Sequence, residues 1–450
     1  MSSSPGSDAP RSAVLLDRLE HFGVKLGLER IRRLLTELGN PQLQTPLVLV
    51  GGTNGKGSTS ALIASMARAA GYRVGTFASP HLESLRERIG IDGRAIDDET
   101  LADCLERILA PAATARAEPP TFFEAMTLSA FLHYRDAEAD LAVMEVGLGG
   151  RLDATNVGEP LVSAVVSIGF DHQKQLGNTL AAIAGEKAAI ARPARPLVTW
   201  AETDEVRGAF THHAARLGAR LVRVDATTRL LDTSNRSSDD AWATRQRFHL
   251  ETPRAAYDLE IAMPGAHQRR NAAVATAVAE ELALSGFEAI DREAIERGAA
   301  ACYWPGRLEW VELPDGRRLL LDVGHNAAGA AAVADYVARG TAGDERTVDL
   351  LFGAVGDKAI EKMLPTLAAR AQRVTLTRPE SSRAGDPHDW LPMLEPGTDV
   401  RVVVDPSDAL EQALAQLEPR RALVVTGSIF LVGALRRRLR ERFGVPAATT

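Results

Sequence analysis

The chain has 450 residues, and because domains average about 150 residues, this length corresponds to two or three domains. Hydrophobic residues make up 45% and charged residues 25% of the chain, a globular composition that excludes a wholly disordered protein. The formal charge of −7 and the 5% share of aromatic residues argue against a nucleic-acid partner, which needs a basic surface or a stacking platform.

Apolar runs typical of buried strands alternate with helical stretches in the first part of the chain. The predicted strands are 46–50, 74–77, 141–146, 162–168 and 196–199, and the predicted helices between them are 58–70, 121–134 and 180–190. Strands separated by helices predict an α/β fold with a parallel, doubly wound sheet.

The middle of the chain has a different pattern. A polar run at 232–240 predicts a loop, and the runs at 245–252 and 256–263 predict an antiparallel pair. A second alternating block follows Tyr303-Trp304-Pro305-Gly306, with predicted strands at 319–323, 348–352, 374–377, 400–404 and 422–425 and a Pro/Gly-rich loop at 386–399. We therefore expect two α/β domains, residues 1–302 and a smaller second domain of residues 303–450.

The ends and the cysteines of the chain indicate its compartment. The first ten residues predict a disordered polar tail without the apolar core of a secretory signal. No segment reaches the ~18 uninterrupted apolar residues of a membrane-spanning helix. Cys104 and Cys302 lack a metal-site spacing, and reduced thiols are expected, with a single disulfide as the alternative. These features predict a cytoplasmic protein without a membrane partner.

A glycine-rich segment, Gly51-Gly52-Thr53-Asn54-Gly55-Lys56-Gly57-Ser58, joins a predicted strand to a predicted helix. Glycines let backbone N–H groups close on phosphate oxygens, the helix start favours anions, and Lys56 adds a positive charge. The segment departs from the G-x-x-x-x-G-K-[ST] pattern, because Val50 holds the first position and Gly57 replaces the hydroxyl that binds Mg²⁺. We predict a nucleotide-binding loop whose missing hydroxyl comes from Ser58 or from elsewhere; a plain turn with a solvated lysine is the alternative.

Three side chains near the ends of predicted strands are suited to bind Mg²⁺: Ser79, Glu145 and His172. Ligands of open α/β sheets gather at the carboxyl ends of strands, so these positions predict a metal site beside the glycine-rich loop. Taken singly, each has a structural alternative: an ion pair of Glu145 with Arg151, a helix cap at His172 and a turn at Ser79.

Lys187 lies in the predicted helix at 180–190, next to Glu186. Lysines at such positions are usually exposed and paired with a neighbouring glutamate. Spacing alone therefore predicts a surface lysine without a chemical role.

Taken in order, these motifs resemble the folylpolyglutamate synthase/dihydrofolate synthase family of the Mur-ligase superfamily. The matching segments are 52–58, 79–82, 87–89, 121–124, 145–156, 171–172, 176–179, 186–188, 264–267, 271–272, 304–309, 322–326 and 427–433. The resemblance implies a Mur-ligase-like ATP-binding domain with a phosphate-binding loop, followed by a Rossmann-like α/β ligase domain.

The resemblance also implies an activity, the ATP-dependent joining of a folate-type carboxylate to the amino group of L-glutamate. In that family the carboxylate attacks the γ-phosphate of ATP, and the glutamate amine then displaces phosphate from the acyl phosphate. Most of the catalysis then comes from positioning and charge neutralisation. The implied substrates are dihydropteroate, tetrahydrofolate and L-glutamate, and the implied oligomeric state is a monomer.

Roles for single residues follow from the same resemblance. The ATP site would contain Thr53, Asn54, Gly55, Lys56, Gly57, Ser58, Asn271 and Arg307, with Asp322 and His325 closing over the nucleotide from the second domain. The Mg²⁺ ligands would be Ser79, Glu145 and His172, and Lys187 would carry CO₂ as a carbamate supporting a second Mg²⁺, which reverses the surface-lysine prediction. The pterin pocket would be lined by Thr121, Phe122, Phe123, Glu124, Leu152, Asp153 and Ala154.

Two positions depart from the family motifs: Ala189 replaces a glycine, and Val323-Gly324 replaces Gly-Ala. The proposed ATP and metal residues are retained, so a degenerate paralogue is not expected. Because neither domain holds the whole site, we expect closure about a hinge at 303–306 to assemble it and exclude water.

Several other functions stay open at this point. They are a monofunctional dihydrofolate synthase or folylpolyglutamate synthase, a Mur-type ligase with another substrate, a regulatory P-loop NTPase and a non-catalytic folate-binding module. We expect a bifunctional enzyme, since the segments 122–124 and 152–154 are compatible with a dihydropteroate pocket.

Overall fold

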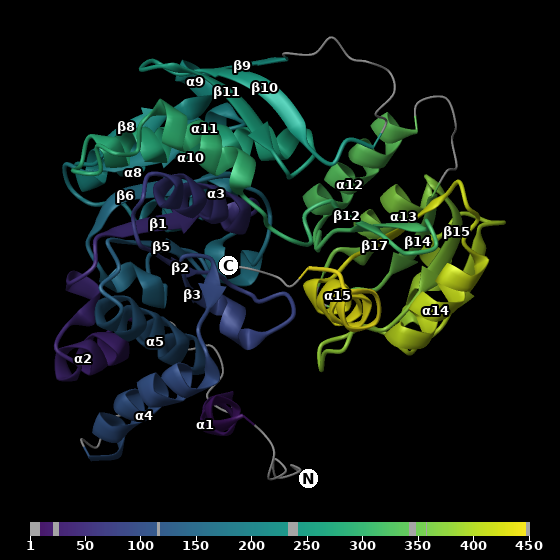
Figure 1. Ribbon diagram of the computed structural model, residues 1–450, viewed down its shortest axis with the longest axis horizontal. Helices are drawn as coiled ribbons and strands as arrows, with labels where there is room; N and C mark the ends of the chain where they lie inside the picture. Colours follow the sequence, from purple (N-terminus) through teal and green to yellow (C-terminus); the bar gives the residue numbers. More distant parts are fainter. Residues whose placement is uncertain are drawn as a thin grey trace.

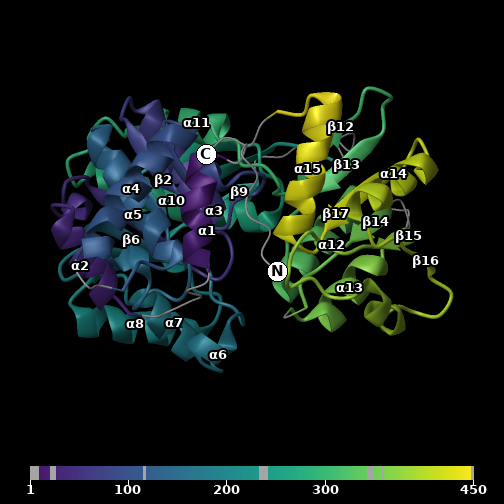
Figure 2. The same cartoon turned by 90° about the horizontal axis from the view of Figure 1, so that it is seen from below.

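The computed structural model of the chain describes residues 10–20, 27–114, 118–232, 242–341, 348–356 and 358–446. Nearly all of the predicted N-terminal tail and most of the predicted loop at 232–240 lie outside these ranges. Within them, two α/β domains lie side by side (Figure 1). A view from below shows α15 (Ile429–Phe443) on the side of the second domain that faces the first (Figure 2).

An eight-stranded sheet forms the centre of the first domain. In spatial order its strands are β4 (Arg94–Ala95), β3 (Ile89–Ile91), β2 (Val74–Phe77), β5 (Leu141–Glu145), β1 (Leu47–Gly51), β6 (Pro160–Val165), β7 (Pro196–Thr199) and β8 (Arg220–Arg223). The strands from β2 to β8 are parallel, and β3 and β4 extend one edge in antiparallel pairs. The predicted parallel α/β sheet is confirmed.

Helices cover both faces of this sheet because its strands are apolar on both sides. In β1, Leu47 and Leu49 face one core, and Val48 and Val50 face the other. The first core is covered by α1 (Arg11–Glu20), α2 (Glu29–Glu37), α4 (Asp98–Thr114), α5 (Phe122–Asp136), α7 (Leu180–Ala188) and α8 (Asp204–Leu217), and the second by α3 (Lys56–Ala69), α10 (Ala266–Ala283) and α11 (Arg292–Ala301). Short helices are η1 (Pro41–Leu43), η2 (Leu85–Arg88), η3 (Ala154–Val157), α6 (Gln173–Leu176) and α9 (Val224–Thr227).

A small antiparallel sheet packs on the outer side of α10 and α11. It consists of β11 (Ala256–Ile261), β10 (Gln246–Glu251) and β9 (Arg229–Asp232). Phe248, Leu250 and Leu259 from this sheet join the core beneath α3. The predicted antiparallel pair is confirmed, and β9 is a third strand that the sequence pattern did not indicate.

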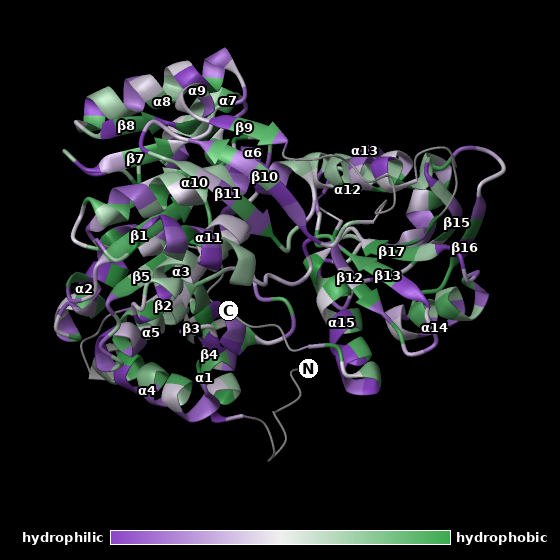
Figure 3. Ribbon diagram, turned by 45° about the horizontal axis from the view of Figure 1, so that its top comes forward, coloured by the Kyte–Doolittle hydropathy of each residue, from purple (hydrophilic) through white to green (hydrophobic). Residues whose placement is uncertain are grey.

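The second domain contains a six-stranded sheet. Its strands in spatial order are β12 (Glu309–Glu312), β13 (Arg318–Leu321), β17 (Ala422–Thr426), β14 (Val348–Phe352), β15 (Ala371–Leu376) and β16 (Asp399–Val402). Only the β12–β13 pair in this sheet is antiparallel. One face packs against α12 (Ala327–Gly340) and α13 (Ile360–Ala368), and the other packs against α14 (Pro406–Gln416) and α15. Figure 3 shows hydrophobic residues concentrated in the central strands of both large sheets.

Some predicted boundaries differ from the structure for local reasons. The predicted strand at 162–168 ends at Val165, because the next residues turn toward the glycine-rich loop, where Thr53 N donates to Ser167 O (2.8 Å). The predicted loop at 386–399 contains a 3₁₀ helix, η4 (Pro387–Met393). This helix buries Trp390 against Phe352, with 5.6 Å between the ring centroids.

The helices and the two cysteines bear on the predictions about membranes and disulfides. No helix within the described ranges is long and apolar enough to cross a membrane. Cys104 and Cys302 are buried free thiols, so the disulfide alternative is wrong.

Candidate active site

The glycine-rich segment connects β1 to α3 and is held by the chain that follows β6. Asn54 N donates to Ser167 Oγ (3.0 Å), and Thr53 Oγ1 donates to Gly169 O (3.1 Å). Gly55 has a φ of +83° and stands at the N-cap of α3, where it offers no side chain to the first helical N–H groups. These N–H groups are therefore left for a ligand, and the positive end of the helix dipole favours an anion there.

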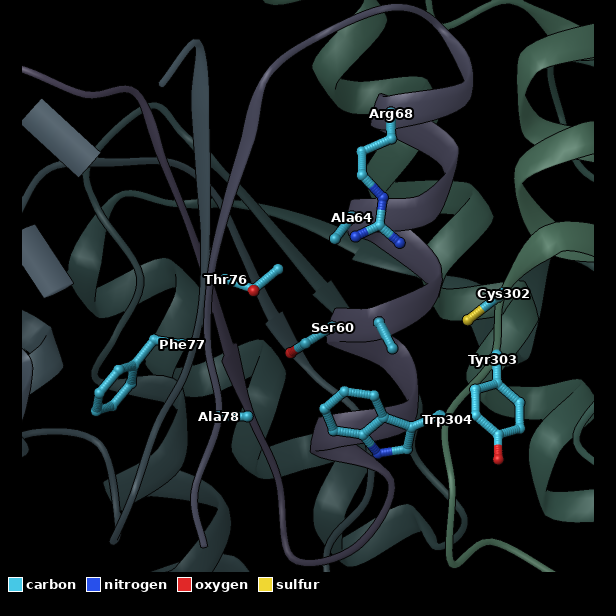
Figure 4. Close-up of a pocket in the computed structure, with 10 residues that line it drawn as sticks. Ser60, Ala64, Arg68, Thr76, Phe77, Ala78, Cys302, Tyr303 and Trp304 are labelled. Carbon is cyan, nitrogen blue, oxygen red and sulfur yellow. The ribbon is translucent and has the colours of Figure 1, made fainter. Parts of the chain in front are cut away.

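Two glycines of this segment lie where other residues approach closely. A β-carbon at Gly55 would lie 2.4 Å from Asn271 Oδ1, so Asn271 packs directly against the loop. A β-carbon at Gly57 would lie 3.1 Å from Trp304 Nε1 and 3.4 Å from Glu145 Oε2. This crowding explains why a serine or threonine is absent at position 57. Figure 4 shows the Trp304 ring beside α3, next to the turn that bears Ser60.

Glu145 lies at the end of β5 and faces the loop. Its side chain is 8% exposed, Ser79 N donates to Oε2 (3.3 Å), and Lys56 Nζ lies 3.8 Å from Oε1. Burial raises the pKa of Glu145, while the charge of Lys56 and the Ser79 N–H oppose that rise. Arg151 pairs with Glu186 (2.9 Å), so the alternative pairing of Glu145 with Arg151 is wrong.

Lys187 is buried rather than exposed, and the surface-lysine prediction is wrong. The residue is 6% exposed, and Nζ donates to Gly52 O (2.9 Å) at the base of the loop. Burial, with the nearby charge of Lys56, lowers the pKa of Lys187 to about 7. A fraction of this amine is therefore uncharged at neutral pH.

His172 occupies the N-cap position of α6 with a φ of +51°, but its side chain makes no capping bond. Burial lowers the pKa of His172, Asp171 opposes this, and the charges of Lys358, Lys187 and Lys56 lower it further. The charge of Lys56, in the glycine-rich segment, is therefore among those that act on His172.

The second domain reaches the same region through residues after β13. Asp322 accepts hydrogen bonds from Gly324 N (2.7 Å) and Leu308 N (2.9 Å), which fix its carboxylate. Burial raises the pKa of Asp322, and the charge of Arg307 opposes that rise. The charge of Arg307 also opposes the rise in the pKa of Glu145, so a second-domain charge acts on the candidate metal ligand.

Contacts between Asn326 and Asn54 and between Asp171 and both Lys358 and His325 join the domains across the site, and of these residues only Asn54 and His325 have a role predicted from the sequence. Asn326 Nδ2 donates to Asn54 Oδ1 (2.9 Å), and Lys358 Nζ pairs with Asp171 Oδ1 (3.0 Å). His325 Nε2 lies 4.0 Å from the other oxygen of Asp171. Lys358 follows the predicted strand at 348–352, so the strand-end reasoning used for Glu145 was the signal that could have found it.

The predicted pterin residues form two groups that meet at Gly147. Phe123 packs so closely over Gly147 that a β-carbon there would lie 2.5 Å from the ring, and it also contacts Phe77 (5.8 Å between centroids). The Arg88 guanidinium lies over the Phe122 ring, 5.2 Å from its centroid. Asp153 of the second segment accepts from Leu148 N, next to Gly147, so the two predicted segments, 121–124 and 152–154, approach the same turn after β5.

The polar members of that region have structural partners. Thr121 and Glu124 form the capping box of α5, and Arg30 Nε donates to Glu124 Oε2 (2.7 Å). Asp153 caps η3 and accepts from Leu148 N (2.8 Å). Their substrate-binding roles stay predictions, as do those of Leu152 and Ala154.

Comparison with known proteins decides the family. The chain matches the Mur ligase middle domain over residues 50–279 and the Mur ligase glutamate ligase domain over residues 306–429. It is 34% identical over 427 residues to the dihydrofolate synthase/folylpolyglutamate synthase of Bacillus subtilis, covering 93% of this chain and 96% of that protein. The chain belongs to this family.

Solved structures of this family have the same fold. The folylpolyglutamate synthase of Thermotoga maritima superimposes with a TM-score of 0.81 at 34% identity, covering 95% of this chain and 96% of that one. A bifunctional folylpolyglutamate synthase/dihydrofolate synthase solved with Mn, AMPPNP and L-glutamate gives 0.81 at 29% identity, with 97% and 100% coverage. The chain is an ATP-dependent ligase of the Mur ligase family, and the predicted family, fold class and enzyme class are confirmed.

Proposed function

We propose that this enzyme joins L-glutamate to dihydropteroate, forming dihydrofolate, and to tetrahydrofolate, extending its glutamate chain, as ATP is converted to ADP and phosphate. The observation that carries this proposal is a single site shared by two domains. The first domain supplies the phosphate-binding loop with Lys56, and Glu145 beside it. The second domain brings Asn326 into contact with Asn54 of that loop and Lys358 into contact with Asp171. The names of the relatives, which include both activities, support the bifunctional assignment.

The division of work follows the two domains, residues 1–302 and 303–450. Residues 53–58 and Asn271 would hold the ATP phosphates and nucleotide, with Arg307, Asp322 and His325 closing from the second domain. Asp322 is buried and held by two backbone N–H groups, and the charge of half-buried Arg307 acts on it, so the carboxylate needs little reorganisation as charge moves onto the leaving phosphate. Closure of the domains would exclude water from the acyl phosphate.

The residues present suit Mg²⁺ held jointly by protein and nucleotide. No group of three or more His, Cys, Asp or Glu side chains in the described part of the chain is arranged to hold a metal alone. Mg²⁺ commonly binds through one or two carboxylates, waters and phosphates, which matches Glu145 with Ser79 and His172 as partners. The hydroxyl of Ser58 is buried without a hydrogen-bond partner and lies in the phosphate-binding loop. Bound Mg²⁺ would neutralise phosphate charge.

Lys187 is suited to carry a carbamate. In that reaction the ammonium first loses one proton, the uncharged amine adds to the carbon of CO₂, and loss of a second proton leaves an anionic carbamate. The buried position of Nζ at Gly52 O, beside the positive Lys56, is a place where an anion would be favoured over a second cation. Such a carbamate would support a second Mg²⁺.

Phosphate release from Mg·ATP and L-glutamate tests the function, with dihydropteroate, tetrahydrofolate or no acceptor present. We expect release with both acceptors, together with products heavier by one glutamate in mass spectrometry. Release with only one acceptor would show a monofunctional enzyme. Equal release in all three reactions without an amide product would instead support a regulatory NTPase.

We further infer a cytoplasmic monomer. The free thiols Cys104 and Cys302 support a reducing compartment, and the monomer follows from the family resemblance. Light scattering after size exclusion should give a mass near 48.2 kDa, and about twice that value would overturn it.

A further inference from the structure

A buried cluster of charges joins the two domains at a distance from the phosphate-binding loop. At its centre is Arg436 of α15, whose side chain is 0% exposed. Its guanidinium donates to Glu83 of the first domain, to Glu309 (2.9 Å) and to the hydroxyl of Tyr303 (2.8 Å). Arg440, one turn further along α15, donates to the other Glu83 oxygen (2.9 Å). Two arginines thus face two carboxylates, so the buried charges balance.

Glu83 belongs to the segment that also bears Ser79, residues 79–84, which we call the Ser79 loop. The loop is stiffened by the Glu87 carboxylate, which accepts from Leu82 N (2.9 Å) and Ser84 N (2.8 Å) as well as from Glu83 N (3.1 Å). One end of the loop contacts Glu145 through Ser79 N, and the other is held by Arg436. A displacement at Glu83 would therefore be transmitted to Ser79.

The helix backbone also contacts the Ser79 loop directly. A β-carbon at Gly433 would lie 1.8 Å from Leu82 O, so only glycine permits this approach of α15 to the loop. The Leu82 side chain packs into the core of the second domain that α15 covers. Gly433 and Arg436 lie about one turn apart on the same face of α15, and together they make a docking surface for the loop.

We propose that Arg436 and Gly433 are positioning residues that hold the Ser79 loop, and with it the metal-binding hydroxyl of Ser79, in place from the second domain. The inference rests on the proposed function, in which Ser79 and Glu145 bind Mg²⁺. It links the position of the second domain to metal binding in the first, because release of α15 from the loop would loosen Ser79. Residues that orient metal ligands typically change metal affinity by about 10–100-fold when they are removed.

Mn²⁺ binding tests this proposal without relying on turnover. Free Mn²⁺ is measured by electron paramagnetic resonance in titrations of the full chain with a non-hydrolysable ATP analogue present. Glu83→Ala leaves Arg436 paired with Glu309, and Gly433→Ala adds a methyl group that pushes the loop away while favouring the helix. We expect both variants to bind Mn²⁺ about tenfold or more weakly. Arg442 lies on the same helix as Arg436 and forms an exposed pair with Glu411 of α14. Its replacement, Arg442→Ala, should change Mn²⁺ affinity by no more than about twofold.

Two further measurements separate the possible failures. Circular dichroism melting shows whether each variant is folded. Arg436→Met should bind Mn²⁺ more weakly than the wild type, and Arg436→Lys should keep part of the Mn²⁺ affinity that Arg436→Met loses. Ser79→Ala tests the proposed function itself: if it binds Mn²⁺ like the wild type, Ser79 is not a ligand. If Ser79→Ala binds weakly while Glu83→Ala and Gly433→Ala bind normally, the metal site stands and the positioning role is wrong.

Discussion

The burial of Lys187 could not be predicted from its local sequence. Lys187 has a neighbouring glutamate and a helical spacing that are typical of a surface lysine, yet it is 6% exposed and bonded to Gly52 O. Spacing within one helix carries no information about which segment packs against it, and Gly52 lies 135 residues earlier. The sequence could therefore identify Lys187 only through the family resemblance.

The first prediction concerns the proposed carbamate on Lys187. Replacing Lys187 with alanine should lower the rate of phosphate release by about a hundredfold, because the group that would support a second Mg²⁺ beside the phosphates is lost. Acetate should restore part of the activity by occupying the space with a carboxylate. Lys174→Ala on the exposed α6 should have no effect and serves as the control. A Lys187→Ala enzyme with full activity, or one insensitive to acetate, would contradict the carbamate.

The second prediction concerns the thiols. Burial raises the pKa of Cys104 to about 11 and that of Cys302 to about 12. Between pH 9 and these values the folded state keeps protons that the unfolded state loses, so the free energy of unfolding should fall as pH rises. The expected slope is about 1.4 kcal/mol per pH unit for each thiol. Urea unfolding at pH 8 to 10.5 measures it, and a variant with alanine at both positions should lack this part of the slope.

At the scale of elements, the sequence predicted the interior strands well. The predicted strands at 74–77, 196–199 and 348–352 coincide with β2, β7 and β14 because each is a fully buried apolar run between turn residues. Among the missed strands, β9 and β12 are short, partly exposed edge strands with a charged residue at each end, and their pattern resembles that of a loop. Whether such a segment forms a strand depends on its pairing with a neighbouring strand rather than on its local composition.

Glycines with positive φ in and after the phosphate-binding loop allow a prediction about ATP binding. Gly55 and Gly71 both have positive φ, at +83° and +92°, so alanine at either should cost about 1 kcal/mol of stability. Only at Gly55 would the new methyl group collide with a neighbour, Asn271, while the space around Gly71 is open. Gly55→Ala should therefore raise the KM for ATP about tenfold or more, and Gly71→Ala should leave it unchanged. Equal KM values in steady-state assays would show that the contact with Asn271 does not shape the ATP site.

At the scale of the whole molecule, the contacts between domains could not be predicted from the chain. Lys358 and Asp171 are 187 residues apart, and Arg436 and Glu83 are 353 residues apart. The α/β pattern indicated two domains and placed the candidate ligands at strand ends, but the side chains that meet between domains depend on how the two sheets are oriented. These pairs hold the residues that each domain contributes to the candidate active site next to one another.

The last prediction follows from the burial of Arg436. Replacing it with methionine would leave the Glu83 and Glu309 carboxylates, 5% and 9% exposed, without their shared cation. Glu83 keeps Arg440 (2.9 Å), but Glu309 loses its cation. Loss of one partner from a buried ion pair costs about 3–5 kcal/mol, so Arg436→Met should unfold at clearly lower temperature. Because the lost contact with Glu83 lies between the domains, calorimetry should resolve two transitions where the wild type shows one. Arg442→Met, which loses only an exposed pair, should unfold like the wild type. One unshifted transition in Arg436→Met would mean that the charge cluster does not couple the two domains.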